Sequence, residues 1–384
     1  MRRQPTQRNR PLRVAHLIQY FAIGGLERMV ERLAVASQRR GVESLVIGYL
    51  GDGPIQAALK EHGIPTVLLP GGPGFDPALS LRLRATLARE RIDVLHTHHL
   101  GPFVYGAPAA VLARCGHVHT EHSHELYDRP RRQVLGALMP AFAKVVAVTP
   151  EVAEFRRRFP GSCRVIPNGV PIPAPIEPTS RADARRRLGI PMRALAIGCA
   201  ARLSEEKNHQ GLLEGFARFR ESAPDAILVC AGDGPLKESL ESRAQEAGLG
   251  DSVTWLGAVE EMGSFYRALD VCVLNSHREG LPLSLLEAMS FAVPVVATDV
   301  GGVGELLAGG DGVLVPANDA VALAEALRRL SSAPEERKRL GQAGRELVRE
   351  RYGVEQMAER YVTLYREVSR AEAKPRDTES VPCG

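Results

Sequence analysis

The sequence is poor in the features that mark membrane, secreted or metal-binding proteins. No apolar run approaches the roughly 18 residues that a transmembrane helix requires, and the first ten residues are polar and basic, so we expect neither a membrane span nor a secretory signal. No two cysteines are spaced as C-x-x-C, which argues against a disulfide framework or a zinc finger: Cys115, Cys163, Cys199, Cys230, Cys272 and Cys383. We therefore expect a cytoplasmic protein with reduced thiols.

Three common nucleotide-binding motifs are absent as well. The sequence contains no G-x-x-x-x-G-K-[ST], no G-x-G-x-x-G between a strand and a helix, and no D-x-D pair for a divalent metal on a nucleoside diphosphate. If the chain binds a diphosphate, side-chain cations and backbone amides must neutralise it. We expect no metal site and no cofactor.

The charge is unevenly distributed along the 384 residues. The overall formal charge is only +4, but residues 1–170 carry 23 Lys/Arg against 13 Asp/Glu, a net charge of +10, and the remainder is acidic. A basic half can attract anionic lipid, a phosphate-bearing acceptor or nucleic acid, although solvated helix faces are the plain alternative. Nucleic acid is the least favoured partner, because aromatic residues make up only 5% of the chain.

Strands and helices alternate along the first part of the chain. The near-continuously apolar strands are typical of a parallel sheet that is covered on both faces. We expect strands at Arg13–Ile18, Ser44–Tyr49, Thr66–Leu69, Val94–His96, Val118–Thr120, Val145–Val148 and Arg164–Ile166, and helices at Leu26–Arg40, Gly53–His62, Pro77–Arg89 and Gly101–Arg114.

A second alternating series follows the proline-rich linker Pro167–Pro178. We expect strands at Ala194–Cys199, Ala226–Ala231, Val253–Leu256, Val271–Asn275, Val295–Thr298 and Gly312–Val315, separated by helices, with terminal helices at Ala320–Leu330, Pro334–Arg351 and Val354–Ala373. The chain thus divides into an acceptor-side domain (12–170), a donor-binding domain (171–353) and a frayed tail (374–384). Ligands of open α/β sheets bind at the carboxyl ends of the strands, so two such domains predict a cleft between them.

Two segments of the second series carry candidate phosphate-binding groups. Arg202 and Lys207 follow an expected strand and could converge on one diphosphate, although a solvated loop is the plain alternative. Pro282 suits the first turn of the next candidate helix, whose free N–H groups at Leu283 and Ser284 form an anion site. Glu279 and Glu287 flank this helix start, and each carboxylate could accept hydrogen bonds from sugar hydroxyls.

These motifs in combination resemble family 4 of the retaining glycosyltransferases. The resemblance covers roughly residues 12–370 and rests on Arg202…Lys207-Asn208, Ala231-Gly232-Asp233-Gly234-Pro235, Glu279-Gly280-Leu281-Pro282 with Glu287 (an E-x7-E pair), Asp299–Glu305, Ile166–Val170, Leu314-Val315-Pro316 and Gly24-Gly25-Leu26-Glu27. Ala201 and Leu281 are mild departures, since the family usually has Gly and often Phe there. The family implies the GT-B fold, which is an α/β fold of two facing Rossmann-like parallel-sheet domains with an interdomain cleft. In that fold the C-terminal helix 354–373 packs back on the first domain.

The resemblance also implies a role for individual residues. Arg202 and Lys207 would hold the donor diphosphate, Glu279 would contact donor-sugar hydroxyls, and Glu287 would bind the ribose. The remaining donor-binding positions would be Gly25, Gly257, Gly280, Leu281, Leu283 and Ser284, with Leu256 and Val259 beside the base. Gly24 would approach the phosphate or acceptor, and His119 would lie near the reacting sugar.

Seven of the eleven histidines lie between His96 and His124: His96, His98, His99, His117, His119, His122 and His124. A metal site is the less favoured reading, since no H-E-x-x-H motif is present and on an extended strand His117 and His119 share one face while their neighbours alternate. Strand-end histidines that touch donor or acceptor are favoured instead. His119 is the first candidate, and Glu121 and His122, expected on the following loop, are the second.

The predicted function is therefore retaining, metal-independent hexosyl transfer from a nucleoside diphosphate sugar, with a UDP-sugar favoured, to a glycan or lipid-linked acceptor in cell-surface polysaccharide biosynthesis. The basic first half favours peripheral contact with anionic lipid at the inner face of the plasma membrane. Three alternatives stay open: a sugar-nucleotide epimerase, a glycan phosphorylase, and a non-catalytic nucleotide-sugar binding protein. The sequence identifies neither the sugar nor the acceptor.

Overall fold

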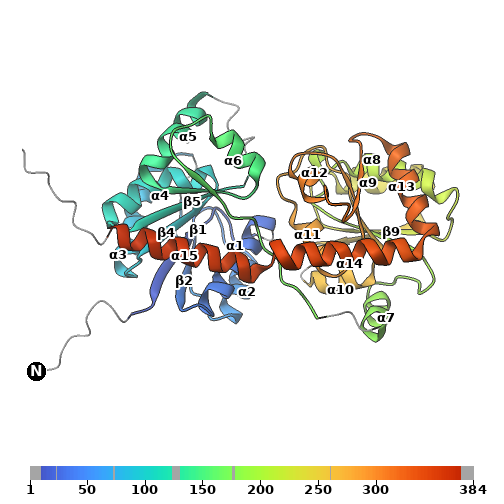
Figure 1. The fold of residues 1–384 in the computed structure, drawn as a ribbon, viewed down its shortest axis with the longest axis horizontal. Coiled ribbons are helices and arrows are strands. Elements are labelled where there is room, and N and C mark those ends of the chain that lie inside the picture. Colours follow the sequence, from blue (N-terminus) through green and yellow to red (C-terminus); the bar gives the residue numbers. More distant parts are fainter. Residues whose placement is uncertain are drawn as a thin grey trace, which may run out of the picture. The chain divides into compact units, whose positions relative to one another are not determined.

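The computed structural model of the chain describes residues 10–22, 24–71, 74–122, 130–174, 178–259 and 261–372. His124 and the tail 374–384, both discussed above, lie outside these residues. The chain divides into two compact units (Figure 1). The first unit comprises Met1–Asn168 and Val354–Gly384, and the second comprises Gly169–Gly353.

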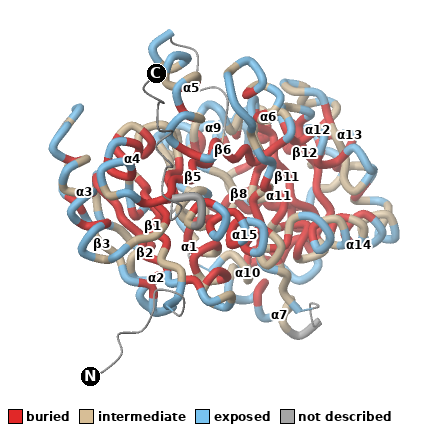
Figure 2. Tube along the Cα trace, turned by 60° about the vertical axis from the view of Figure 1, so that its left-hand side comes forward, coloured by how far each residue is buried: buried red, intermediate tan, exposed pale blue. Residues whose placement is uncertain are grey.

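The first unit is built on a seven-stranded parallel sheet in the order β3-β2-β1-β4-β5-β6-β7. Its strands are β1 (Leu12–Leu17), β2 (Val42–Gly48), β3 (Thr66–Leu68), β4 (Val94–His98), β5 (Gly116–Glu121), β6 (Lys144–Ala147) and β7 (Cys163–Val165). Every residue of β4 and β5 is buried, as expected of central strands with both faces covered; Figure 2 shows β5 in the buried colour.

The helices of the first unit are α1 (Gly25–Gln38), α2 (Ile55–Glu61), α3 (Pro77–Arg89), α4 (Leu100–Ala113), α5 (Pro130–Phe142), α6 (Pro150–Arg156) and α15 (Val354–Glu372). Helices α1 and α15 pack against each other, and α15 also packs on β4 and β5 (Figure 1). A Cβ on Gly116 would lie 2.4 Å from Val368, so only glycine allows α15 to approach β5 this closely. The C-terminal helix therefore completes the core of the first unit.

The second unit is built on a six-stranded parallel sheet in the order β10-β9-β8-β11-β12-β13. Its strands are β8 (Ala196–Ala200), β9 (Ile227–Ala231), β10 (Val253–Gly257), β11 (Val271–Leu274), β12 (Val295–Thr298) and β13 (Val313–Val315). Its helices are α7 (Pro178–Arg187), α8 (His209–Arg220), α9 (Lys237–Glu246), α10 (Met262–Ala268), α11 (Leu283–Ser290), α12 (Gly302–Leu306), α13 (Ala320–Ser332) and α14 (Pro334–Arg351).

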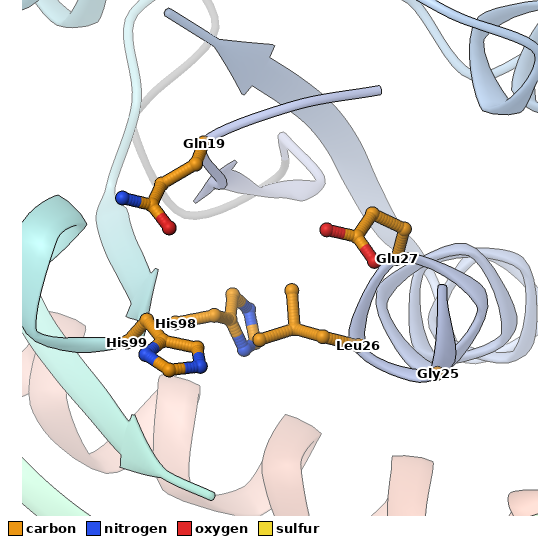
Figure 3. A pocket seen from close by; sticks show the side chains of 6 residues that line it. All are labelled: Gln19, Gly25, Leu26, Glu27, His98 and His99. Carbon is orange, nitrogen blue, oxygen red and sulfur yellow. The ribbon is translucent and has the colours of Figure 1, made fainter. Parts of the chain in front are cut away.

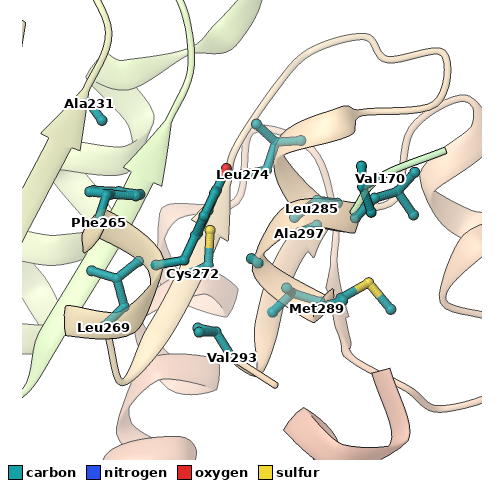
Figure 4. Packing of buried hydrophobic residues seen from close by; sticks show 14 of the residues in the cluster. Val170, Ala231, Phe265, Leu269, Cys272, Leu274, Leu285, Met289, Val293 and Ala297 are labelled. Carbon is teal, nitrogen blue, oxygen red and sulfur yellow. The ribbon is translucent and has the colours of Figure 1, made fainter. Parts of the chain in front are cut away.

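Buried side chains pack on both faces of the sheet in the second unit. Figure 4 shows one of the two buried clusters, in which Cys272 and Leu274 of β11 pack with Leu285 and Met289 of α11. The other face carries Phe216 and Phe219 of α8 together with residues of α13. This packing fixes α11 behind β11, so the start of the helix lies at the carboxyl end of that strand.

The alternation of strands and helices confirms the predicted α/β class, and helix α7 shows where the sequence pattern was uninformative. Its sequence is almost entirely polar, which gives no apolar periodicity. The helix is anchored instead by Arg185, which is 2% exposed and donates hydrogen bonds to the carbonyls of Ala268 and Ala194. The same guanidinium pairs with Asp270 at 2.6 Å. Helices α5 and α6 were likewise not predicted.

Each sheet contains one point at which the strand order reverses. In the first unit this switch point lies between β1 and β4, and in the second it lies between β8 and β11. Chain connections leave such a point in opposite directions, which opens a crevice at the carboxyl ends of the two strands. The loops after β1, β4, β8 and β11 are therefore the places to examine for a site. None of the helices in the described residues is both long and apolar enough to cross a membrane.

Candidate functional site

Lys207 lies in a tight turn that follows β8 in the second unit. The 3₁₀ turn Glu205–Lys207 leads into Asn208, which adopts a left-handed conformation with φ 47°. The Asn208 side chain accepts a hydrogen bond from the N–H of Gly211 at 3.1 Å and so caps α8. Asparagine tolerates this backbone conformation better than most residues, so the Lys-Asn pair ends the turn in one fixed geometry.

Hydrogen bonds tie this turn to the loop that follows β11. The N–H of His277 donates to the carbonyl of Glu206 at 2.8 Å, and the amide of Asn275 donates to the carbonyl of Asn208 at 3.2 Å. The Thr298 hydroxyl donates to the carbonyl of Ser276 at 2.7 Å, which adds a link to β12. The two loops that border the β8/β11 switch point are therefore held as one assembly.

An ion pair joins Lys207 to Glu279 across this switch point. The distance from Lys207 Nζ to Glu279 Oε1 is 2.7 Å, and the two side chains are 22% and 7% exposed. The hydroxyl of Ser276 also donates to Glu279 Oε1 at 2.6 Å. Lys207 thus presents a positioned positive charge, and Glu279 keeps acceptor capacity for hydroxyl groups.

Helix α11 begins four residues after Glu279. Its first residues, Leu283 and Ser284, are half-buried, and Pro282 precedes them in an extended conformation. The first N–H groups of a helix have no partner within the helix and carry a partial positive charge, which suits an anion. Leu281 is buried, and Gly280 is half-buried between it and Glu279.

Glu287 lies one turn inside α11. Its Oε2 accepts a hydrogen bond from the hydroxyl of Tyr266 at 2.8 Å. Tyr266 lies on α10, and its fully buried ring stacks on Phe291. The Glu287 carboxylate is therefore held from α10. Glu279 and Glu287 are consequently positioned by different partners, as two separate contacts to one ligand would require.

Arg202 and Gly257 lie at the same edge of the sheet, Arg202 in the loop after β8 and Gly257 at the end of β10. Arg202 follows β8 and is exposed, and Gly257 is the last residue of β10. The carbonyl of Gly257 accepts a hydrogen bond from the N–H of Gly232 at 2.7 Å. A Cβ on Gly232 would lie 2.0 Å from the carbonyl oxygen of Ala201, so glycine is required for the loops after β8 and β9 to pack. Ala201 itself is accommodated in this packing.

Gly24 and Gly25 of the first unit follow β1 at the β1/β4 switch point. Gly24 is the N-cap of α1 and Gly25 is its first residue. A pocket of about 270 Å³ opens here (Figure 3), lined by Gln19, Gly25, Leu26, Glu27, His98 and His99. Of these residues, the sequence had indicated Gly25 as a donor-binding position and His98 and His99 as members of the histidine group, whereas Gln19 had no assigned role.

His119 lies on β5 and is 1% exposed. Its Nδ1 is 2.9 Å from the Thr97 hydroxyl, which also contacts His117 Nε2 at 2.9 Å. His117 and His119 therefore share one face of the strand, as predicted. Burial is the main reason that the pKa of His119 lies well below its ordinary value, so its imidazole is neutral.

The placement of Glu121 corrects an expectation. Glu121 is the last residue of β5 rather than a loop residue, and its side chain is buried 3.6 Å from the buried Arg156 guanidinium. The strand continues because β6 pairs with it as far as Ala147. His122 does follow the strand, half-buried, with its ring centroid 5.8 Å from that of His98.

Sequence reasoning missed a group of histidines on the opposite face of the first sheet. His16, His96 and His98 are fully buried, and one ring nitrogen from each lies within 4.8 Å of the others, a spacing that could hold a metal ion. In the structure these nitrogens bond within the protein: His16 Nδ1 to His98 Nε2 at 3.3 Å, and His96 to Tyr365 and Thr120 at 2.7 Å each. The alternation of His96 and His98 signalled a shared face, but only the register of β1 against β4 brings His16 beside them.

Comparison with known proteins identifies the family of this chain. The model of "Glycosyltransferase Family 4" matches residues 23–172, and that of "Glycosyl transferases group 1" matches residues 180–347. The D-inositol 3-phosphate glycosyltransferase of Stackebrandtia nassauensis is 31% identical over 330 residues, which cover 78% of this chain and 72% of that protein. The chain belongs to glycosyltransferase family 4.

Two further relatives of this family 4 glycosyltransferase extend over most of the chain. The 2-deoxystreptamine N-acetyl-D-glucosaminyltransferase of Streptomyces fradiae is 28% identical, over 91% of this chain and 92% of that protein. The crystal structure of HepE from Anabaena in complex with UDP-glucose matches with a TM-score of 0.83 at 22% identity, over 93% of this chain and 100% of that one. The two parallel sheets thus form the GT-B fold, and the protein is a glycosyltransferase.

Proposed function

We propose that this glycosyltransferase moves a hexosyl group from a nucleoside diphosphate sugar, with a UDP-sugar favoured, to a glycan or lipid-linked acceptor in cell-surface polysaccharide biosynthesis. The observation that carries the proposal is the Lys207–Glu279 ion pair at the β8/β11 switch point, four residues before the start of α11. The solved HepE complex contains UDP-glucose, which supports the choice of uridine.

In the proposed donor site, Lys207 and Arg202 neutralise the diphosphate, and the first N–H groups of α11 at Leu283 and Ser284 add fixed dipoles. The N–H of Gly280 and that of Leu281 face the donor sugar, Glu279 accepts bonds from its hydroxyls, Glu287 binds the ribose, and Gly257 borders the base. Because these charges are held before the reaction, they stabilise the charge that develops on the leaving diphosphate without reorganisation. The proposal needs no divalent ion at this site.

The transfer proceeds with retention. The bond from the anomeric carbon to the β-phosphate oxygen breaks, and the acceptor oxygen forms a new bond to the same face of that carbon. The acceptor proton passes to the leaving phosphate oxygen. His119 is neutral because it is buried, so it contributes a hydrogen bond to substrate rather than a charge. Gly24, Glu121 and His122 are the proposed acceptor-side residues. Glu121 influences the acceptor through the buried Arg156 guanidinium beside it.

The first unit supplies a surface for contact with an anionic membrane. Helix α5 exposes Val134, Leu138 and Phe142, which are four residues apart and therefore lie on one helix face. Two exposed basic residues, Arg131 in the first turn of α5 and Lys144 at the start of β6, suit anionic headgroups. A lipid-linked acceptor would be reached from such a surface at the cytoplasmic face.

The stereochemistry of the product tests the proposal. The purified chain is incubated with UDP-α-glucose and a panel of glycan and lipid-linked acceptors, and the anomeric configuration of the product is read by proton NMR. An α-linked product is expected. A β-linked product would contradict retention, and release of free glucose at the same rate with and without every acceptor would contradict transfer.

A further inference from the structure

Four groups of the first unit form a chain of hydrogen bonds that ends at His119. The carbonyl oxygen of Phe142 lies 3.2 Å from His117 Nδ1, and the Thr97 hydroxyl lies 2.9 Å from both His117 Nε2 and His119 Nδ1. Thr97, His117 and His119 are all buried. Each hydrogen bond places one proton between two heavy atoms, so the direction of one bond decides the direction of the next.

Helix α4 fixes the geometry of this chain. The ring of Phe103 stacks on that of His117, with centroids 5.6 Å apart, and meets the His119 ring edge-on at 5.0 Å. A Cβ on Gly106 would clash with Thr97 Cγ2, so the threonine methyl group faces α4. The Thr97 hydroxyl is thereby turned toward the two imidazoles.

The direction of the chain is set at Phe142, the last residue of α5. A carbonyl oxygen only accepts hydrogen bonds, so His117 Nδ1 carries a proton and donates it to Phe142. Burial lowers the pKa of His117 to about 4, so its ring is neutral at pH 7 and Nε2 is a bare acceptor. The end of a helix thus fixes the tautomer of His117.

The Thr97 hydroxyl passes this constraint on to His119. Two bare acceptors do not lie 2.9 Å apart, so the hydroxyl donates its proton to His117 Nε2. The carbonyl of Val118, at 3.4 Å, is a more distant acceptor for the same proton. The Thr97 oxygen is left to accept, and His119 Nδ1 must be the N–H that donates to it. Burial keeps His119 neutral, so its Nε2 carries no proton.

His119 Nε2 itself has no hydrogen-bond partner among the described residues. We infer that Thr97 and His117 are positioning residues that hold His119 in its Nδ1–H tautomer, so that Nε2 accepts a hydrogen bond from a substrate hydroxyl and cannot donate one. The inference rests on the proposed function, which gives His119 its contact with substrate. It adds the direction of that contact and the two residues that determine it.

Nitrogen NMR of the full chain without substrate tests the tautomer. The protein is isotope-labelled at histidine, and the His119 signals are those missing from His119→Gln. In the wild-type protein we expect a protonated Nδ1 and a bare Nε2. In Thr97→Val the Nδ1 proton loses its partner, so the tautomer ratio should shift about tenfold toward Nε2–H. Thr97→Ser keeps the hydroxyl and should retain the wild-type signals.

A second variant, His117→Phe, tests the relay without changing either atom of the Thr97–His119 bond. It removes the acceptor of the Thr97 proton, so the hydroxyl should donate to His119 Nδ1 instead and Nε2 should become protonated. Thr86→Val is the matched control, because it makes the same change at another buried threonine of the first unit. It should leave the His119 signals unchanged. A wild-type His119 with a proton on Nε2, or an unchanged tautomer in His117→Phe, would overturn the inference.

Turnover of UDP-glucose tests the consequence for substrate. Thr97→Val and His117→Phe are expected to lower kcat/KM about tenfold, the effect of one lost hydrogen bond, whereas Thr97→Ser and Thr86→Val should stay near the wild-type value. An unchanged kcat/KM in a variant whose tautomer has switched would contradict the assigned role of Nε2. Because the NMR sample contains no donor, a wild-type protein with the expected tautomer but no turnover would count against the proposed function alone.

Discussion

Lys207 and Glu279 are 72 residues apart in the sequence, yet Lys207 Nζ lies 2.7 Å from Glu279 Oε1. The pair spans the two strands at which the order of the second sheet reverses. Glu279 is nearly buried, so the lysine both compensates this carboxylate and presents a charge to any ligand at the switch point. Removing the lysine therefore has two separable consequences, one for stability and one for binding.

The first prediction concerns Lys207→Ala. Loss of the charge is expected to reduce turnover with a UDP-sugar on the order of 100-fold, by analogy with the loss of one preorganised donor from an oxyanion site. The variant should also be destabilised, because Glu279 is left unpaired in a mostly buried position. Steady-state kinetics and thermal unfolding measure the two effects.

The double variant Lys207→Met with Glu279→Gln separates the two effects. It removes both charges, so thermal stability should recover toward that of the wild-type protein while turnover stays low. Recovery of turnover together with stability would show that Lys207 acts through the fold alone.

The second prediction concerns the strained backbone of His99, whose φ of 81° and ψ of 158° lie in a region that is essentially restricted to glycine. His99→Ala keeps the positive φ, whereas His99→Gly relieves it, so the glycine variant should be the more stable of the two. We expect a difference of about 1 kcal/mol after the greater unfolded-state entropy of glycine is allowed for. Chemical denaturation of both variants measures it. An alanine variant that is as stable as the glycine variant would argue against strain at this position.

The third prediction concerns acid sensitivity. Burial lowers the pKa of His117 to about 4 and that of His209 to about 4, from an ordinary value near 6.5. Between pH 4 and pH 6.5, these two histidines bind protons in the unfolded chain but not in the folded chain. Stability is therefore fully present above pH 6.5 and is lost as the pH falls toward 4, by at most about 1.4 kcal/mol per pH unit for each histidine.

Urea denaturation between pH 7.5 and 5 measures this slope. The variant His117→Gln should show a shallower decline than the wild-type protein, whatever its stability at pH 7.5. An identical slope in both proteins would mean that His117 is protonated in the folded state.

The fourth prediction concerns the exposed face of α5. Leu138→Glu with Phe142→Glu should weaken flotation with anionic vesicles on the order of tenfold, through lost apolar burial and charge repulsion. Wild-type binding should fall as salt rises. The matched control is Val321→Glu on α13, a residue with similar exposure in the second unit. Salt-insensitive wild-type binding, or equal flotation of all three proteins, would remove α5 as a membrane contact.

Much of the architecture could be predicted because it follows from local pattern. The apolar strands and the Gly, Pro and charged residues of the loops determine the alternation of β and α units, and these loops placed Lys207, Glu279 and Gly25 at carboxyl ends of strands. Helix α7 could not be predicted, because its packing depends on one buried arginine, Arg185, rather than on apolar periodicity.

The grouping of residues in the pocket of the first unit could not be predicted from the sequence. Gln19 and Glu27 follow β1, whereas His98 ends β4 and His99 follows it, and 71 positions separate Glu27 from His98. Only the pairing of these strands brings them together. Glu121 was misplaced for a related reason, since the extension of β5 depends on its pairing with β6.

Calorimetric titration with UDP in the presence of EDTA tests the central claim most directly. The account predicts that the wild-type protein binds UDP equally well with and without the chelator, and that Lys207→Ala and Arg202→Ala each weaken binding about tenfold or more, the loss expected for a charge-assisted contact. Loss of wild-type binding in EDTA, or unchanged binding in both variants, would contradict it.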